Sequence, residues 1–332
     1  MIMIINCRGA FLMKLRYLTL LLVVLSVLSI FIGVVDLAPR HLLQLSANDK
    51  NILINSRLPR TISIILAGAA LSISGLLMQQ LTRNKFVSPT TAGTMDFAKL
   101  GILIAMIFFT EAHILVKLIF AIMAAIIGTL SFMYIVNRIK YKDAIFIPLV
   151  GLMLGNIVSS FATFMALRFN AMQSIGNFFV GDFSMVTSGR YEILYIIIPM
   201  VILIYFYAYH FTIVGMGESF SRNLGIPYER MMNIGVIISA VVSATVVVTI
   251  GVLPFLGLVV PNIVYMLVGD HLQKTLPYTA LLGSILVMVA DLFSRLIIFP
   301  YEIPIGLTLG IIGSVLFMLL LLKRRNEYVA KI

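Results

Sequence analysis

The sequence contains little charge and almost no cysteine, and each shortage excludes a class of protein. Only 11% of the 332 residues are Asp, Glu, Lys or Arg, whereas 61% are hydrophobic and the mean hydropathy is +1.09. A soluble domain needs far more polar surface, so water cannot be the main solvent of this chain. The single cysteine, Cys7, excludes a disulfide framework within the chain.

Motifs for catalysis and for metal binding are missing as well. The sequence has no G-x-x-x-x-G-K-[ST] phosphate loop, no G-x-S-x-G elbow and no pair of Gly-Asp motifs at one membrane depth. We therefore expect no enzyme activity, no cofactor and no metal site, and any ATP hydrolysis would need a separate subunit. The histidines are too dispersed to show metal-ligand spacing: His41, His113, His210 and His271.

Long apolar segments make up most of the chain. Backbone polar groups inside a bilayer must be hydrogen-bonded within the protein, and a helix of about 20 residues crosses a core of about 30 Å. The segments are too long for barrel strands, so the predicted fold class is all-α, a polytopic membrane protein with about ten transmembrane helices. They are residues 16–36, 60–81, 93–110, 114–136, 144–167, 191–210, 232–252, 254–269, 277–296 and 305–322.

The distribution of basic residues predicts the orientation. An even number of crossings puts both termini on one side, and Lys and Arg collect in cytoplasmic loops. Most of the 24 Lys and Arg lie on the side of the termini. We therefore predict one transmembrane domain, residues 1–332, with a cytoplasmic N-terminal extension (1–15), a cytoplasmic loop (211–230) and a cytoplasmic tail (323–332). The outer segments are more basic than the rule predicts, and they hold Arg40, Lys50, Arg57, Arg60, Lys117, Arg168, Arg190 and Arg295.

Four stretches spread over nearly the whole chain carry motifs in a fixed order. They are residues 56–61 (SRLPRT) with 67–71 (AGAAL) and 79–84 (QQLTRN), 217–225 (GESFSRNLG), 251–262 (GVLPFLGLVVPN), and 290–295 (ADLFSR) with 302–306 (EIPIG) and Gly313. Together they resemble the iron-chelate and cobalamin permease family, often called FecCD. The chain departs from this family at Asn262, where its members usually have histidine.

This resemblance implies the membrane-spanning permease subunit of an ATP-binding-cassette importer, with the bundle of the cobalamin importer, in the cytoplasmic membrane of a bacterium. It also implies three partners: two copies of a cytoplasmic ATP-binding subunit, an extracytoplasmic binding protein or lipoprotein, and a second permease, identical or paralogous. Residues 86–99 (FVSPTTAGTMDFAK) resemble the branch that imports ferric siderophores, which favours a catecholate or mixed siderophore. Transport would proceed by alternating access between the two permeases.

Arginines at the predicted outer surface are candidates for receptor docking. Arg57 and Arg60 are three residues apart, on one helical face, and Arg295 lies near the outer end of the ninth predicted helix. By resemblance, the three dock acidic residues of the extracytoplasmic receptor. The chemistry suits this contact because a guanidinium offers a planar fork to a carboxylate. Alternatively, these side chains snorkel and anchor helix ends at the lipid headgroups.

The polar loop 211–230 is predicted to form two short helices. Gly217 opens the first, Gly225 supplies the left-handed residue that ends it, and Pro227 fits the first turn of the second. Such helices can lie in a groove of an ATPase and transmit rigid-body motion. The alternative is an ordinary solvated loop. By resemblance, this loop is the ATPase-coupling element, and its main residues are Gly217, Glu218, Arg222, Leu224 and Gly225.

Asp96 and Lys99 lie three residues apart in the third apolar segment, so they face the same side of a helix and can pair. An unpaired charge at mid-membrane costs about 2.5–3.5 kcal/mol on insertion scales. The pair either lines or gates the translocation path, or it locks this helix to its neighbours. A different function is also open, namely an ion-coupled secondary transporter with Asp96 and Asp291 as carriers. That function leaves the loop 211–230 and the outer arginines without a role.

Overall fold

The computed structural model describes residues 15–33, 47–109, 113–139 and 145–329, and every regular element among them is a helix, which confirms the all-α fold. The predicted N-terminal extension lies outside the described residues except for Leu15, and so do residues 330–332 of the predicted tail. The elements are α2 (Leu15–Phe31), α3 (Ala47–Ile52), the π-helix η2 (Leu53–Arg57), α4 (Leu58–Thr82), α5 (Thr94–Phe108), α6 (Ile114–Arg138), α7 (Phe146–Arg168), α8 (Met172–Phe179), the 3-10 helix η3 (Tyr191–Ile196), α9 (Ile197–Phe206), α10 (Ala208–Met216), α11 (Glu218–Asn223), α12 (Tyr228–Thr249), α13 (Leu256–Val268), α14 (Leu272–Leu296) and α15 (Ile305–Val329).

Each predicted apolar segment coincides with a helix or with a bent helix pair. Within the described residues, six helices are long and apolar enough to cross a membrane, and Tyr191–Phe206 with Ala208–Met216, bent by 60°, can form a seventh crossing. The shorter helices α2, α5 and α13 occupy the three remaining predicted segments. The predicted membrane bundle is therefore confirmed.

One predicted boundary is wrong, and one predicted crossing is shorter than the membrane core is thick. Residues 49–82 form one helical stretch of 34 residues, whereas the prediction began at 60. Hydropathy marks where a segment becomes apolar, but the helix here continues through the polar residues of η2. The helix in predicted segment 254–269 has only 13 residues, about 20 Å at 1.5 Å per residue, so it does not cross a core of about 30 Å by itself.

Helices α4 and α12 form the centre of the bundle. In each, 78% of the most apolar window is buried inside the protein. Small residues let the neighbouring backbones approach closely, because a β-carbon at Gly75 of α4 would lie 1.9 Å from the carbonyl oxygen of Gly257 in α13. Polar contacts join the same helices, since the Ser74 and Ser239 hydroxyl groups are 2.7 Å apart. This packed centre holds the more irregular parts of the chain in place.

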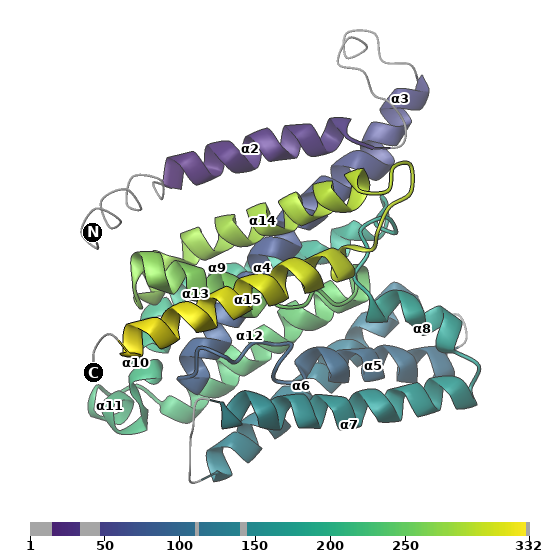
Figure 1. Cartoon of the computed structure of the whole chain (residues 1–332). Coiled ribbons are helices and arrows are strands. Elements are labelled where there is room, and N and C mark those ends of the chain that lie inside the picture. Colours follow the sequence, from purple (N-terminus) through teal and green to yellow (C-terminus); the bar gives the residue numbers. More distant parts are fainter. Residues whose placement is uncertain (1–14, 34–46, 110–112, 140–144, 330–332) are drawn as a thin grey trace.

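The two ends of the bundle carry different features (Figure 1). The start of α2, the end of α15 and the short helix α11 lie at one end, whereas α3 and the turn between α14 and α15 lie at the other. Helices α2 and α14 run side by side along one flank, and α5, α6 and α7 form the opposite flank. The arrangement separates the predicted coupling element from the predicted docking arginines by the length of the bundle.

Candidate functional site

Two non-helical segments lie inside the bundle, residues 84–93 before α5 and residues 250–255 before α13. Side chains satisfy the backbone of the first segment: the Ser88 amide donates to Thr91 Oγ1 at 2.8 Å, and the Thr91 hydroxyl donates to the Phe86 carbonyl at 3.2 Å. Irregular backbone at membrane depth is tolerated only where protein buries it or where it lines a cavity. A cavity beside these two segments is therefore a candidate functional site.

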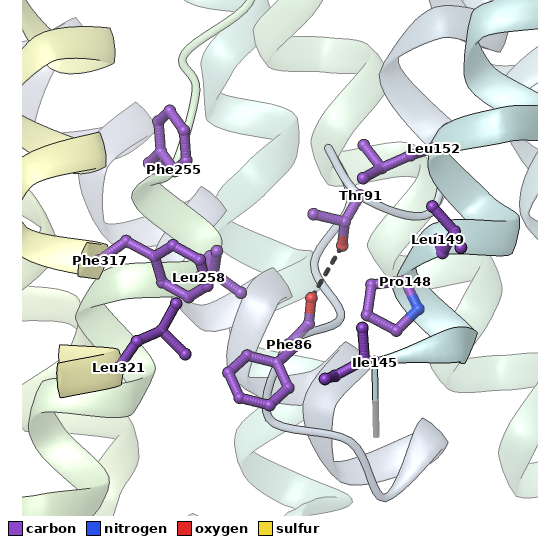
Figure 2. Close-up of a pocket in the computed structure, with 10 residues that line it drawn as sticks. All are labelled: Phe86, Thr91, Ile145, Pro148, Leu149, Leu152, Phe255, Leu258, Phe317 and Leu321. Atoms are coloured by element: carbon purple, nitrogen blue, oxygen red, sulfur yellow. Dashed lines mark hydrogen bonds between the residues drawn. The ribbon is translucent and has the colours of Figure 1, made fainter. Parts of the chain in front are cut away.

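A cavity of about 460 Å³ lies beside both segments, between α7 and α15. Figure 2 shows its two walls, with the residues of the 250–255 region and α15 on one side and those of α7 on the other. Phe317 of α15 contacts both irregular segments, with its ring centroid 6.1 Å from that of Phe86 and 6.4 Å from that of Phe255. The lining residues are Phe86, Thr91, Ile145, Pro148, Leu149, Leu152, Phe255, Leu258, Phe317 and Leu321.

The lining of this cavity is almost entirely apolar. Its one polar side chain, Thr91, uses its hydroxyl group in the bond to the Phe86 carbonyl (Figure 2). Such a wall offers no charge or donor that would hold a polar ligand in one place. Chemically, the cavity suits passage or transient contact better than tight binding.

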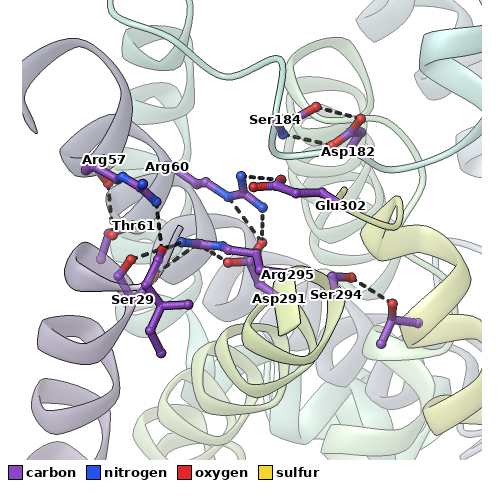
Figure 3. A network of polar contacts seen from close by, with 12 residues as sticks. Ser29, Arg57, Arg60, Thr61, Asp182, Ser184, Asp291, Ser294, Arg295 and Glu302 are labelled. Carbon is purple, nitrogen blue, oxygen red and sulfur yellow. Dashed lines mark hydrogen bonds and ion pairs between the residues drawn. The ribbon is translucent and has the colours of Figure 1, made fainter. Parts of the chain in front are cut away.

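At the end of the bundle that carries α3, buried charges form a network (Figure 3). The Arg60 guanidinium donates to Asp291 at 2.8 Å and to Glu302 at 2.7 Å, and Arg295 forms a second ion pair with Asp291. Asp291 is 0% exposed. A buried carboxylate is tolerated when cations and hydrogen bonds compensate it, and here two guanidinium groups do so.

The same network holds the end of α2. Arg295 donates to the carbonyl groups of Ser29 and Ile32 at 2.9 Å each, and Arg57 donates to the Ile32 carbonyl at 2.7 Å. Carbonyl groups at a helix C-terminus lack partners within the helix and carry partial negative charge, so cations stabilise them. The two arginines thus cap α2 and attach it to α14 and η2.

The three predicted docking arginines therefore lie in one cluster, but their side chains point into the protein. Arg57 and Arg60 are each 8% exposed, and Arg295 is 2% exposed. The snorkelling alternative is wrong for Arg295, because its guanidinium group is enclosed by Ser29 and Asp291. The most accessible charged group of the network is Glu302, whose side chain is 23% exposed.

At the opposite end, α11 forms a short exposed helix. Gly217 precedes it with a φ of +123°, and Gly225 follows it with a φ of +74°, so both glycines stand where they were predicted. The Ser221 hydroxyl donates to the Gly217 carbonyl at 2.8 Å and to the Ile213 carbonyl at 3.2 Å, which anchors one side of the helix. The two glycines therefore bound α11 at both ends, as the sequence predicted.

The outer side of α11 combines an ion pair with apolar groups. Glu218 and Arg222 are paired at 2.7 Å, and both side chains are more than half exposed. Phe220 is 46% exposed and Leu224 is 54% exposed, one helical turn apart. Adjacent exposed apolar side chains flanked by charges are typical of a protein interface.

The prediction of two short helices in the loop 211–230 is wrong. Residues 211–216 complete α10, and after Pro227 the chain enters α12, a helix of 22 residues. The apolar run before Gly217 continues α10. No proline follows Pro227 before α12 ends at Thr249, and Gly235 lies inside this helix without ending it. Only α11 is a separate short helix.

Asp96 and Lys99 form the predicted pair at 2.7 Å, with side chains 23% and 10% exposed. The Lys99 ammonium lies 4.9 Å from the centre of the Phe179 ring in α8. A β-carbon at Gly155 of α7 would lie 2.6 Å from Asp96 Oδ2, so the glycine makes room for the carboxylate. The pair connects α5 to α7 and α8, and neither residue lines the cavity of Figure 2.

Asn262, which stands where histidine is usual in the resembling family, has a structural role. Its side-chain amide donates to the carbonyl groups of Lys85 and Leu258 at 2.7 Å each. Lys85 in turn pairs with Asp270 at 2.5 Å. These contacts fasten the start of segment 84–93 to α13 and to the turn that follows it.

Sequence reasoning missed several residues that the fold brings together. The motif stretches contain Phe86, Phe255 and Glu302. Their aromatic or charged side chains could have marked them as candidate site residues. Phe317 carries no such signal, because it is one apolar residue among many in α15. Its position in the cavity depends on three segments distant in sequence, which only the fold reveals.

Comparisons with known proteins agree along nearly the whole chain. A model of the FecCD transport family matches residues 21–323. The petrobactin import system permease protein YclN of Bacillus subtilis is 56% identical over 313 residues, which cover 94% of this chain and 99% of that protein. The ferric-anguibactin transport system permease protein FatD of Vibrio anguillarum is 41% identical over 271 residues, 82% of this chain and 86% of that protein.

A solved structure shares the fold. It is described as an inward-facing conformation of a metal-chelate type ABC transporter, and it superposes with a TM-score of 0.79 at 24% identity. The match covers 93% of this chain and 98% of that chain. At this identity the likeness establishes the arrangement of the helices.

Proposed function

Because this chain belongs to the FecCD transport family, we propose that it is the permease through which an ATP-binding-cassette importer moves a ferric siderophore across the cytoplasmic membrane of a bacterium. The chain is a transport permease and not an enzyme. The observation that carries the siderophore assignment is the 56% identity, over 94% of this chain, to a petrobactin permease. A second relative, at 41% identity, serves ferric anguibactin.

The proposed assembly contains this chain and three kinds of partner. Two copies of an ATP-binding subunit bind the end with α11, an extracytoplasmic siderophore-binding protein or lipoprotein binds the end with α3, and a second permease, identical or paralogous, completes the path within the lipid bilayer. This places residues 1–15, 211–230 and 323–332 of the single domain in the cytoplasm. The distribution of basic residues supports this orientation.

Residues of α11 are proposed to couple ATP hydrolysis to transport. Gly217 and Gly225 set the ends of the helix, and Glu218, Arg222 and Leu224 form its exposed side. A short amphipathic helix that lies in a groove of another subunit moves with that subunit. Closure of the two ATP-binding subunits would therefore displace α11.

A continuous set of contacts leads from α11 to the apolar cavity. A β-carbon at Gly217 would lie 3.0 Å from the Arg83 guanidinium at the end of α4, and the Gln80 amide of α4 donates to the Thr212 carbonyl of α10 at 3.4 Å. Segment 84–93 directly follows α4, and its residue Phe86 lines the cavity. Displacement of α11 would thus move one wall of the cavity, as alternating access requires.

For the outer end, we propose that the receptor binds by replacing one ion-pair partner of the buried arginine network. Arg57, Arg60 and Arg295 are the proposed docking residues, and Glu302 now occupies the accessible side of Arg60. An acidic side chain of the receptor would displace Glu302 and take its place on the guanidinium group. Before the receptor binds, the ion pairs with Asp291 and Glu302 keep the arginine side chains oriented.

Replacing Glu302 with glutamine tests this exchange. The variant removes the competing charge, so the receptor should reach half-maximal stimulation of ATP hydrolysis at a concentration about two- to fivefold lower, because a partly exposed ion pair contributes up to about 1 kcal/mol. Glu192→Gln, which alters an acid away from Arg60, serves as the control and should change nothing. An unchanged or raised half-maximal concentration for Glu302→Gln would count against the docking role.

The two carboxylates that the ion-coupled alternative would use as carriers are both held in ion pairs. Asp96 is paired with Lys99, and Asp291 is held by Arg60 and Arg295. Each of these carboxylates is therefore engaged by a cation within the bundle, and neither lines the apolar cavity. We propose that Asp96 and Lys99 instead act as a structural pair beside the path.

Replacing Asp96 with asparagine separates the two functions. We expect siderophore-dependent uptake of radiolabelled iron in cells to stay within about threefold of the parent, because an amide fits the space beside Gly155 and keeps a dipole for Lys99. Deleting the ATP-binding subunit should abolish uptake. Loss of uptake in the asparagine variant at normal membrane abundance, together with retained uptake without the ATP-binding subunit, would establish the alternative.

A further inference from the structure

A second cavity, of about 330 Å³, lies at the end of the bundle where α5 ends and α6 begins. Its walls come from α5, α6, α8, the loop 182–190 and the end of α12. None of its lining residues belongs to the apolar cavity or to the arginine network described above. Polar and apolar groups both line it, in contrast to the cavity of Figure 2.

Two cations line this second cavity. They are Lys117 of α6 and Arg190, and neither forms an ion pair within the part of the chain that the structure describes. Both side chains line the same cavity, so their positive charges act on the same space. Two like charges held together at a cavity wall raise the local affinity for an anion.

The one carboxylate of the lining, Asp182, is already engaged. It accepts hydrogen bonds from the amide of Ser184 at 2.8 Å and from its hydroxyl at 2.7 Å, and Figure 3 shows both. Its own amide donates to the Ile250 carbonyl at 2.9 Å, which ties this wall to the end of α12. The carboxylate is therefore held by its own turn, and the lining keeps a net positive charge from Lys117 and Arg190.

We propose that this cavity binds an oxyanion, a phosphate or carboxylate group of a small molecule whose apolar part rests on Met106 and Phe178. Lys117 and Arg190 would donate charge-assisted hydrogen bonds to its oxygens. The volume of about 330 Å³ is at the lower limit of small-molecule sites and suits a headgroup or a small acid. The phosphodiester of an anionic lipid and a free acid from the aqueous phase share this chemistry.

The absence of tryptophan from the sequence provides a direct assay. Phe178→Trp in the full-length chain places a single tryptophan in the cavity wall, and its emission is excited selectively over that of the tyrosines. The chain is reconstituted in phosphatidylcholine nanodiscs and titrated with citrate and with inorganic phosphate. In a parallel arm, increasing fractions of phosphatidylglycerol replace phosphatidylcholine. We expect a saturable change of emission in one of the two arms, and the responding arm identifies the source of the oxyanion.

Paired substitutions decide whether the cations form the site. Lys117→Gln with Arg190→Gln should raise the concentration needed for half the response by about tenfold or more, because the charge-assisted bonds are lost. Arg168→Gln, at the end of α7 and outside the cavity lining, should not. A response in neither arm, or an equal response after the double substitution, overturns the proposal. If Phe178→Trp does not fold, Met185→Trp at the exposed rim replaces it.

Discussion

Replacing both Phe220 and Leu224 with glutamate should abolish ATP-driven siderophore uptake while leaving the permease folded in the membrane. The two side chains are exposed on α11, and the helix is anchored from its other side through Ser221. Burying each apolar side chain in an interface contributes about 1.5–3 kcal/mol, so losing both should weaken binding of the ATP-binding subunit about a hundredfold or more. Co-purification of that subunit and uptake of radiolabelled iron measure the two effects.

Asn223→Glu is the matched control for this double variant. It adds a carboxylate to the same helix at an exposed position but keeps both apolar side chains. We expect it to retain most of the uptake, because an exposed charge in place of an exposed amide changes little. If the control loses as much uptake as the double variant, added charge and not lost apolar contact is the cause. If the double variant transports normally, α11 is not the coupling element.

Asp291→Ala should have the largest effect on stability. The change leaves Arg60 and Arg295 buried without their shared carboxylate, and breaking a buried ion pair from one side costs about 3–5 kcal/mol. Arg295 also holds the end of α2, so the loss should loosen that helix first. Thermal unfolding of the detergent-purified chain, followed by circular dichroism, should show a clearly lower midpoint together with a lower folded yield.

The Lys85–Asp270 pair supplies the control for this prediction. Its aspartate side chain is 56% exposed, so Asp270→Ala should cost less than about 1 kcal/mol and shift the midpoint little. Equal midpoints for the two variants would show that burial of the Asp291 network does not contribute to stability as argued. A normal midpoint for Asp291→Ala alone would lead to the same conclusion.

Hydropathy and spacing were sufficient to predict the bundle and several local features. The apolar segments located the crossings because hydrocarbon-length helices are the common solution for a chain of this composition. The Asp96–Lys99 pair and the glycines that bound α11 followed from helical periodicity and from the left-handed backbone that glycine permits. Each of these features depends on residues that are close in sequence.

Features that join distant segments could not be predicted in the same way. The partners of Arg60 are Asp291 and Glu302, more than two hundred residues away, and no periodicity relates them. The apolar cavity likewise combines segments 84–93 and 250–255 with α15. Hydropathy placed α13 to within two residues, but it gave no sign of the irregular segment 250–255 that precedes this helix. The roles proposed for the arginines and for α11 therefore rest on the fold as well as on the motifs.

Transport by the purified system tests the proposed function most directly. The permease pair and its ATP-binding subunit are reconstituted in liposomes, with ATP enclosed and the receptor loaded with ferric siderophore outside. We predict that iron accumulates inside only when ATP can be hydrolysed, and that ionophores that abolish proton and sodium gradients do not reduce the rate. Accumulation that proceeds without ATP and stops when those gradients are removed would contradict the proposal.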